Sequence, residues 1–538
     1  MTFKMDPDCV NHSTTPSTPK STLNVCDEFR RSRIIQKELR GFGVSPLREP
    51  FQGACLAGVF AFRTVMYLLE SAMAFLVFCL VVPILTTVAV LLWFQEFLIR
   101  RYLSWTRKCT PLPADDAVWQ QDGAKNRHII HALMIIEGTP DIEKLRQIVC
   151  SRLVHGKDEK GDNICPRLTQ IIEKHFGYFV WKEDDNFCMR KHVITWGRDL
   201  PNSLQELDDI ISEICSIPLP EFLSPWQFLV IPIPKENCFG LLLRFHHSIG
   251  DGVALTRVFV GNLYDVPPQT PEPKKFSANQ RVFMWIKAII FGPLMVVTKF
   301  FTPADSSKIH GQELCGKKAI AWSKNIDLSL VKHIKNVVGT TVNDVMVSCI
   351  AGALHDYLQE NGDDSKPEDM WASVPVDIRA STKSVKLENE FSVVYLRLPI
   401  VAKNAVDRLL ATKQRMDAIK ASAQSRASAL SVQIIMLLPE WFSKPILDFF
   451  CSKMSCVLSN VPGPQQTLFL GGQRVVEGIF FVPQRAKIGV GLSIFSYDGR
   501  IRIGILSDQY VIPDPRKVVK DFEKNFWQLV KELNLNEN

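Results

Sequence analysis

The chain has 538 residues, of which 46% are hydrophobic and 22% are charged. This composition is too polar for a protein built mainly of membrane spans, and the length favours two domains over one hydrophobic core. The net charge of +7 is small for such a length, which argues against a nucleic-acid-binding protein. A mild positive charge suits contact with an anionic membrane surface or with phosphate groups.

The 14 cysteines include no C-x-x-C pair, and several lie in apolar runs, among them Cys55, Cys79 and Cys349. A free thiol in such a run behaves as a small hydrophobic side chain. We therefore interpret the cysteines as reduced thiols and not as a disulfide framework or a zinc site.

The N-terminal region contains two contrasting segments. Residues 1–52 are rich in Ser, Thr, Pro and charge, and they predict a disordered or loosely ordered tail without a cleavable signal. Residues 53–97 are apolar, and the part from Ser71 to Gln95 has no charged residue and is long enough to cross about 30 Å of hydrocarbon. We predict a transmembrane segment or a hairpin here. The basic residues that follow favour a cytosolic C-terminal side: Arg100, Arg101, Arg107 and Lys108.

Residues 110–265 alternate between strand-like and helix-like pieces, as expected for an α/β domain. A buried strand from Cys238 to Phe245 runs directly into a pair of histidines. The other predicted strands are 128–138, 176–181 and 228–233, and the predicted helices are 141–153 and 253–264.

A linker rich in Pro and Lys begins at residue 266, and the apolar stretch from Val282 to Phe301 follows it. Because Lys287, Gly292, Pro293 and Lys299 interrupt this stretch, we predict an interfacial hairpin and not a second span. Together they form a connecting segment over residues 266–312.

Residues 313–538 resume the alternation and form the second predicted domain. The clearest helix runs from Thr341 to Leu358, and the chain closes with a helix from Arg516 to Leu533. The predicted strands are 370–376, 392–398, 453–457, 487–497 and 500–506, the last two joined by a hairpin turn at Tyr497–Arg500.

The segment FHHSIGDG, Phe245 to Gly252, carries the strongest chemical signal. A neutral imidazole can accept a hydroxyl proton near pH 7, so His247 is a candidate general base. Asp251 can fix the loop or pair with a cation, and the glycines allow a sharp turn with room for substrate. The alternative is that His246 and His247 are satisfied, partly buried histidines at a strand end, but the complete pattern favours catalysis.

The HH-x-x-x-DG pattern resembles that of acyltransferases with the chloramphenicol acetyltransferase-like fold. Further motifs, in the same order along the chain, narrow the resemblance to the wax ester synthase/diacylglycerol acyltransferase family. They are Pro113–Ala117, Ser224–Trp226, Asn343–Asp344, Val374–Val376 with Arg379, and Ser459–Pro464. The resemblance covers residues 110 to 535 and leaves out the membrane segment.

The resemblance implies two similar α/β domains, residues 110–265 and 313–538, with the active site in a channel between them. It implies that His247 takes the proton of the acceptor hydroxyl while the oxygen attacks a thioester, without a covalent enzyme intermediate. His246 and Gly252 would shape the loop, and Asp251 would be structural and paired with an arginine, for which Arg379 is the candidate. The supporting residues Asn343 and Asp344 would assist the site or the oxyanion; an N-cap role explains Asn343 equally well.

The expected function is transfer of a long-chain acyl group from acyl-CoA to a lipid hydroxyl, first a fatty alcohol and second diacylglycerol. Two alternatives stay open: an inactive lipid-binding or scaffold protein of the same fold, and an acyltransferase for a smaller, non-lipid acceptor. No metal, cofactor or nucleic acid is expected, with acyl-CoA as co-substrate. The expected location is a membrane, first the endoplasmic reticulum with cytosolic catalytic domains, with the plasma membrane or a lipid droplet as alternatives.

Overall fold

The computed structural model describes residues 87–88, 90–106, 109–158, 160–198, 200–266, 278–362, 368–379 and 386–535. The tail predicted for residues 1–52 lies outside these ranges. So does most of the membrane segment predicted for residues 53–97, of which only the last part belongs to a described helix that continues to residue 106.

Within the described ranges, no single helix is both long and apolar enough to cross a bilayer. One bent pair meets the requirement by length and composition alone: α9 (Leu328–Val338) and α10 (Val342–Glu360), at an angle of 97°. Both helices contribute buried residues to the core of the second half of the molecule, as Val331 and Ile350 illustrate.

The first half is built around a six-stranded sheet with the order β13-β14-β2-β7-β6-β5. Its central strand β7 (Cys238–His246) is buried along its whole length, because its alternate Phe and Leu side chains pack on both faces. Its other strands are β2 (Ile129–Glu137), β5 (Val193–Thr195), β6 (Trp226–Ile233), β13 (Phe469–Leu470) and β14 (Gln473–Phe481). Helices α4 (Ile142–Val149), α6 (Leu204–Ser216) and α7 (Gly252–Asn262) accompany it.

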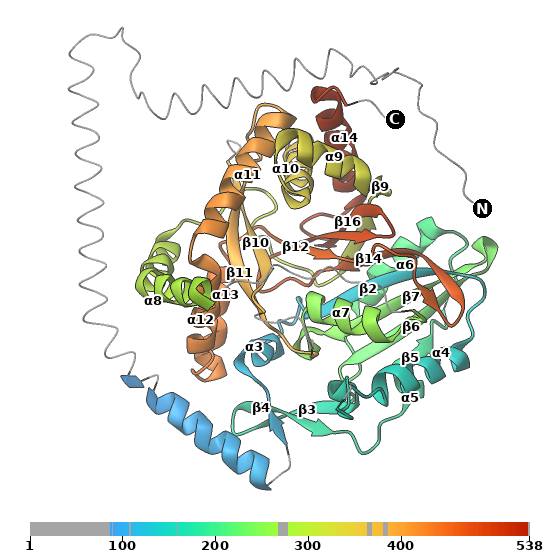
Figure 1. Ribbon diagram of the computed structural model, residues 1–538, viewed down its shortest axis with the longest axis vertical. Helices are drawn as coiled ribbons and strands as arrows, with labels where there is room; N and C mark the ends of the chain where they lie inside the picture. The colour runs from blue at the N-terminus through green and yellow to red at the C-terminus, as the bar shows by residue number, and fades with distance from the viewer. Residues whose placement is uncertain are drawn as a thin grey trace, which may run out of the picture.

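A small three-stranded sheet flanks this half at the lower edge of Figure 1. It contains β1 (Thr110–Pro111), β3 (Gln170–His175) and β4 (Tyr178–Glu183).

The second half contains a seven-stranded sheet with the order β11-β10-β12-β15-β16-β8, in which β9 also pairs with β16. Its strands are β8 (Lys318–Trp322), β9 (Ile326–Asp327), β10 (Met370–Asp377), β11 (Phe391–Leu398), β12 (Cys456–Pro462), β15 (Val490–Tyr497) and β16 (Arg500–Asp508). Helices α9, α10, α11 (Ala405–Ala421) and α14 (Arg516–Glu532) gather at the top of Figure 1. Helices α8 (Ala278–Phe301), α12 (Gln424–Ile435) and α13 (Glu440–Cys451) gather on its left.

The second half contributes two strands to the sheet of the first half. Strands β13 and β14 come from the C-terminal part of the chain, yet β14 pairs antiparallel with β2 and extends the first sheet. The assignment of all of residues 313–538 to one C-terminal domain therefore does not hold for these two strands. The crossing ties the halves together through backbone hydrogen bonds as well as side chains.

The interfacial hairpin predicted for Val282–Phe301 is wrong, because the region forms one helix, α8, that continues through Gly292 and Pro293. The physical reason is close packing against α12. A Cβ on Gly292 would lie 3.3 Å from the Cβ of Ala427, so the glycine permits the helices to approach. Ala288, Ala423 and Ala427 form a small cluster at this contact.

Most predicted elements match the structure, with shifts at their ends. The hairpin between β15 and β16 is confirmed: Asp498 and Gly499 have φ of 49° and 72°, as a tight left-handed turn requires. The strand predicted for residues 453–457 begins later, at Cys456, and the predicted helix 141–153 divides into α4 and a π-helical turn from Cys150 to Val154.

Candidate active site

His247 lies where β7 ends, in a short 3-10 turn (His247–Ile249), and it is 7% exposed. Its backbone N–H donates to the carbonyl oxygen of His128 at 2.7 Å, which fixes the turn to the end of the neighbouring strand β2. The fully buried strand β7 thus delivers the imidazole to the boundary between the halves of the molecule.

The tautomer of His247 is set by Asn389, which lies just before β11 in the second half. Oδ1 of this amide lies 3.0 Å from His247 Nδ1, and its Nδ2 donates to the carbonyl oxygen of His247 at 2.8 Å. Since Oδ1 can only accept, Nδ1 carries the proton and donates. The other ring nitrogen, Nε2, is left with its lone pair, as a general base requires.

Asn389 is held in turn by a buried ion pair from the first half. Asp116 Oδ1 accepts from the backbone N–H of Asn389 at 3.0 Å and from its Nδ2 at 2.9 Å. Asp116 Oδ2 accepts from Arg167 Nη2 at 2.5 Å, and Arg167 Nη1 donates to the carbonyl oxygen of Ile249 at 2.9 Å. We call the connected residues Arg167, Asp116, Asn389 and His247 the base-support chain.

The ring of His247 is stacked on Trp119, with 3.8 Å between centroids and 15° between planes. The ring of Phe391 lies close by, with its centroid 5.7 Å from that of His247 and 5.8 Å from that of Trp119. Burial in these aromatic surroundings lowers the pKa of His247 from its ordinary value of 6.5 to about 3. The imidazole is therefore neutral at physiological pH.

His246 points into a separate polar cluster. Its Nδ1 lies 2.8 Å from Ser248 Oγ and 3.1 Å from Gln120 Nε2, and its Nε2 lies 3.5 Å from Asp122. These contacts tie His246 to the turn that carries His247.

Asp251 joins the helix that follows the histidines to the second half of the molecule. Its Oδ1 caps α7 by accepting from the backbone N–H groups of Val253 and Ala254. Its Oδ2 accepts from Arg379 Nη2 at 2.6 Å and from the backbone N–H of Glu390 at 2.9 Å. The structure thus contains the ion pair expected from the sequence.

Gly252 is the first residue of α7 and lies at the same boundary. A Cβ at this position would come 3.2 Å from Val461 Cγ2 in the Ser459–Pro464 segment. The absence of a side chain at Gly252 therefore allows the two halves to pack closely here.

Asn343 and Asp344 lie in the first turn of α10 and form a different network. Thr341 is the N-cap and forms a capping box with Asp344, so the N-cap role considered for Asn343 is wrong. Asn343 Oδ1 instead accepts from Asn460 Nδ2 at 2.9 Å. Within the described ranges, neither side chain hydrogen-bonds to a member of the base-support chain.

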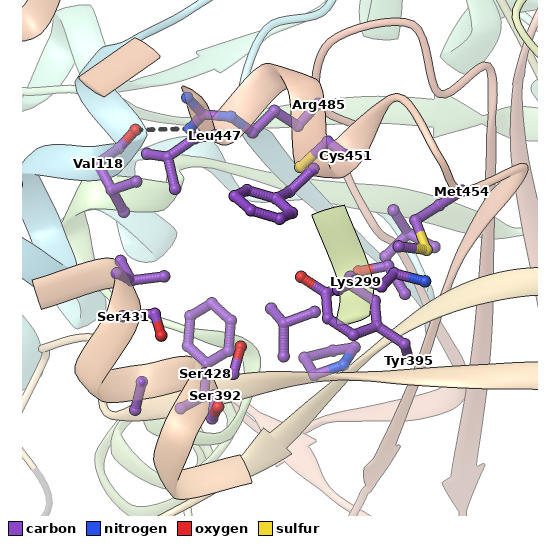
Figure 2. A pocket seen from close by; sticks show the side chains of 18 of the residues that line it. Val118, Lys299, Ser392, Tyr395, Ser428, Ser431, Leu447, Cys451, Met454 and Arg485 are labelled. Carbon is purple, nitrogen blue, oxygen red and sulfur yellow. Dashed lines mark hydrogen bonds between the residues drawn. The ribbon is translucent and has the colours of Figure 1, made fainter. Parts of the chain in front are cut away.

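An apolar cavity of about 470 Å³ opens beside His247 and Trp119 and extends into the second half. Side chains of α8, α12, α13, β10 and β11 line it, and Figure 2 shows Leu447 and Cys451 of α13 across the cavity from Ser392 of β11. Arg485 closes one side by donating to the carbonyl oxygen of Val118 at 3.0 Å. A cavity of this size holds a lipid-like or drug-sized ligand.

Sequence reasoning missed Asn389, Trp119 and Arg167. Asp116 lies in the motif Pro113–Ala117, but the residue types of this motif alone indicate no role for it. Their function depends on contacts between positions far apart in the chain, such as the 273 residues between Asp116 and Asn389. A single sequence carries no local signal for such a contact.

Two sequence profiles match the chain. The wax ester synthase/diacylglycerol acyltransferase catalytic domain matches residues 112–288, and the C-terminal domain of the same family matches residues 387–530. The chain belongs to the wax ester synthase/diacylglycerol acyltransferase family. It is an acyl-CoA-dependent acyltransferase of that family. Relatives include a probable diacylglycerol O-acyltransferase of Mycobacterium tuberculosis, 23% identical over 75% of this chain and 92% of that protein.

The fold is that of solved acyltransferases and condensation domains. The wax ester synthase/diacylglycerol acyltransferase from Marinobacter aquaeolei VT8 superposes with a TM-score of 0.57 at 20% identity, covering 79% of this chain and 100% of that one. The first condensation domain of the calcium-dependent antibiotic synthetase gives 0.53 at 12% identity, over 80% and 97% of the chains. The expected chloramphenicol acetyltransferase-like α/β architecture is confirmed at the level of fold.

The buried position of His247 predicts an unusual pH profile. The base acts when neutral, so a pKa near 3 keeps it active as the pH falls through 6.5. We expect kcat/KM at pH 5.5 to stay within about twofold of its value at pH 7.5, whereas an ordinary histidine would lose about tenfold. Initial rates across this range, with circular dichroism to verify folding, would measure it. A tenfold loss in folded protein would contradict the assignment.

Asn389 is expected to act as a positioning residue. Asn389→Ala removes the acceptor for Nδ1, so the ring loses its fixed tautomer, and we expect kcat to fall about 10- to 100-fold with little change in KM. Steady-state kinetics would separate the two parameters. Asn361→Ala, at the end of α10, is the matched control. A rise in KM at unchanged kcat would instead assign Asn389 to substrate binding.

Proposed function

We propose that this protein esterifies the hydroxyl group of a lipid with the acyl group of acyl-CoA, with His247 as the general base. The observation that carries the proposal is a neutral imidazole of fixed tautomer at the wall of an apolar cavity. A hydrophilic acceptor would gain little from such a cavity, whereas a lipid chain gains about 25 cal/mol for each Å² that it buries.

The proposed reaction is direct transfer within a ternary complex. Nε2 of His247 takes the proton of the acceptor hydroxyl as its oxygen forms a bond to the thioester carbonyl carbon. The carbon–sulfur bond then breaks, and the proton on Nε2 passes to the departing CoA sulfur. His247 is neutral before and after the reaction, and Asn389 Oδ1 accepts from Nδ1 throughout.

The first candidate acceptor is a fatty alcohol, which would make the protein a wax ester synthase. The apolar lining of the cavity supports a long hydrocarbon chain on the acceptor. The second candidate is diacylglycerol, because the Mycobacterium relatives are named as diacylglycerol O-acyltransferases. Both acceptors present a primary or secondary hydroxyl to the same base.

The test is an acyl-transfer assay with labelled palmitoyl-CoA and either hexadecanol or diacylglycerol. We expect His247→Ala to lower kcat about 10²- to 10⁴-fold, the usual contribution of a general base. His333→Ala, on the exposed side of α9, is the matched control and should leave the rate unchanged. Product from hexadecanol would define a wax synthase, and product from diacylglycerol a triacylglycerol-forming enzyme. Folded protein that makes neither would point to a non-catalytic lipid-binding role or to a smaller acceptor.

We further propose that the protein is attached to a membrane, with the endoplasmic reticulum as the first candidate and both catalytic halves in the cytosol. The uncharged stretch from Ser71 to Gln95 supports this. So do large aromatic side chains on described helices that face solvent, among them Trp105 at 83% exposure and Phe301 at 77%. Both candidate acceptors partition into bilayers, so attachment would bring the cavity close to its substrate.

Two lysines placed in the uncharged stretch would test this attachment. Each lysine at the centre of a span costs about 2.5–3.5 kcal/mol of insertion free energy. We expect the wild-type protein to stay with membranes after alkaline carbonate extraction and Leu80→Lys with Leu85→Lys to be released. Leu23→Lys, in the polar tail, is the control. Release of the wild-type protein would refute the proposal.

A further inference from the structure

One strand supplies a phenol hydroxyl to the mostly apolar cavity. Phe391, Val393 and Tyr395 alternate along β11 and line the cavity on the same side. Phe391 lies near His247, and the strand rises by about 3.3 Å per residue, so the backbone of Tyr395 lies about 13 Å along the strand from that of Phe391. Tyr395 therefore belongs to the part of the cavity that is remote from the reaction.

The hydroxyl of Tyr395 is directed toward the middle of the cavity, as Figure 2 shows. Within the described ranges, no side chain or backbone group forms a hydrogen bond with it. Burial raises the pKa of Tyr395 above its ordinary value of 10, so the hydroxyl keeps its proton and can donate. An unused donor in an apolar cavity needs a partner, because burying a hydroxyl without one costs free energy.

Lys299 of α8 lies beside Tyr395 and is 8% exposed. Its Nζ has no hydrogen-bond partner among the described residues. The ammonium instead lies 3.9 Å from the ring centroid of Trp371 and 4.5 Å from that of Tyr395. Burial lowers the pKa of Lys299 to about 8, so it is still mostly charged at pH 7.

The neighbouring acid does not satisfy this ammonium. Asp305 accepts instead from the backbone N–H of Trp371 at 2.8 Å and from Ser455 Oγ at 2.5 Å. A cation above the face of the Tyr395 ring withdraws electron density from it, which makes the hydroxyl a stronger hydrogen-bond donor. The Tyr395 hydroxyl is thus the donor and the Lys299 ammonium the charge that polarises it, and we call the two residues the distal donor pair.

We propose that the distal donor pair is a binding subsite for an oxygen atom carried on the lipid chain, remote from the reacting group. Its ligand is a chain with a hydroxyl, keto or ester oxygen part-way along its length. A plain hydrocarbon chain would fill the same space but leave the Tyr395 hydroxyl without an acceptor. Sites built to hydrogen-bond a substrate reject the analogue that lacks the group, because their buried donors are then unpaired.

The rest of the lining favours a ligand with few polar atoms, and the hydroxyls of Ser392 and Ser431 already donate to backbone carbonyl oxygens. Beyond the distal donor pair, apolar side chains predominate in the wall, as Val432, Leu447 and Phe450 illustrate. Arg485, the other basic residue of the lining, is paired with Asp448 at 2.9 Å. A single phenol hydroxyl suits a neutral oxygen acceptor better than a phosphate group with several charges.

The inference rests on the proposed acyl transfer, and a set of keto lipids tests it. Stearoyl-CoA is compared with stearoyl-CoA bearing a keto group at carbon 8, 10, 12 or 14, and octadecan-1-ol with the corresponding keto-alcohols. A ketone only accepts and adds no second nucleophile. We expect the wild-type enzyme to favour one keto position about tenfold in kcat/KM, in either the acyl or the alcohol series. The series that shows the preference identifies which substrate occupies the cavity.

Three variants assign the preference to these residues. Tyr395→Phe removes only the hydroxyl and should abolish the preference, and Lys299→Met keeps the length of the side chain and should reduce it. Tyr357→Phe, buried in α10 and outside the cavity lining, is the matched control and should retain it. Thermal melting verifies that each variant is folded. No preference at any keto position, or a preference that survives both cavity variants, would overturn the proposal.

A binding measurement separates this outcome from failure of the proposed chemistry. The measurement is the infrared C=O stretching frequency of a ¹³C-labelled keto group on lipid bound to His247→Ala protein. A hydrogen bond from Tyr395 should shift this band to lower frequency. The shift should be absent in the double variant His247→Ala with Tyr395→Phe. This readout requires no turnover. An unshifted band in bound lipid would overturn the subsite even if ester formation is normal. A shifted band, together with no ester formation by the wild-type protein, would leave the subsite standing and refute the acyl transfer.

Discussion

The hydrogen bond from His247 Nδ1 to Asn389 Oδ1 is the contact on which the rest of the site depends. The base stands at the end of a strand in the first half, and the group that sets its tautomer precedes a strand of the second. Neither half alone can present a neutral imidazole with its lone pair on Nε2. The chemistry is therefore a property of the interface, and the interface must be rigid enough to hold two rings and an amide in fixed relation.

Buried charges supply that rigidity at a cost. Asp116 and Asp251 are almost fully buried, and each accepts from an arginine and from backbone or side-chain groups across the boundary. A buried ion pair gains little net stability, because desolvation offsets the attraction, but the loss of one partner is severe. We interpret these pairs as devices that fix geometry. They allow one docked arrangement, in which Asn389 faces His247, and the insertion of β14 into the first sheet reinforces it.

Local patterns in the sequence predicted a large part of this arrangement. The run of buried residues in β7, the alternation in β11 and the turn at Asp498–Gly499 each depend on neighbours in the chain, so their signals are legible in one sequence. The acyltransferase motif identified His247 and Asp251 for the same reason. Asn389, Trp119 and Arg167 gain their roles only from tertiary contacts. The single helix α8 was mispredicted because the packing partner that accommodates Gly292, the alanine face of α12, lies more than 130 residues away in the chain.

The cavity separates the reaction from the selection of the lipid. The base-support chain lies at the boundary of the halves, while α8, α12, α13 and β11 form walls that extend away from it. Of these wall residues, only those next to Trp119 and His247 are constrained by the chemistry. Side chains farther along can change in size or polarity without disturbing the tautomer of the base. The named members of this family act on different acceptors. A separation of the catalytic interface from the far wall of the cavity would let the acceptor change while the catalytic interface is kept. The distal donor pair lies in this far part of the wall. Within the described ranges, it forms no hydrogen bond with the base-support chain.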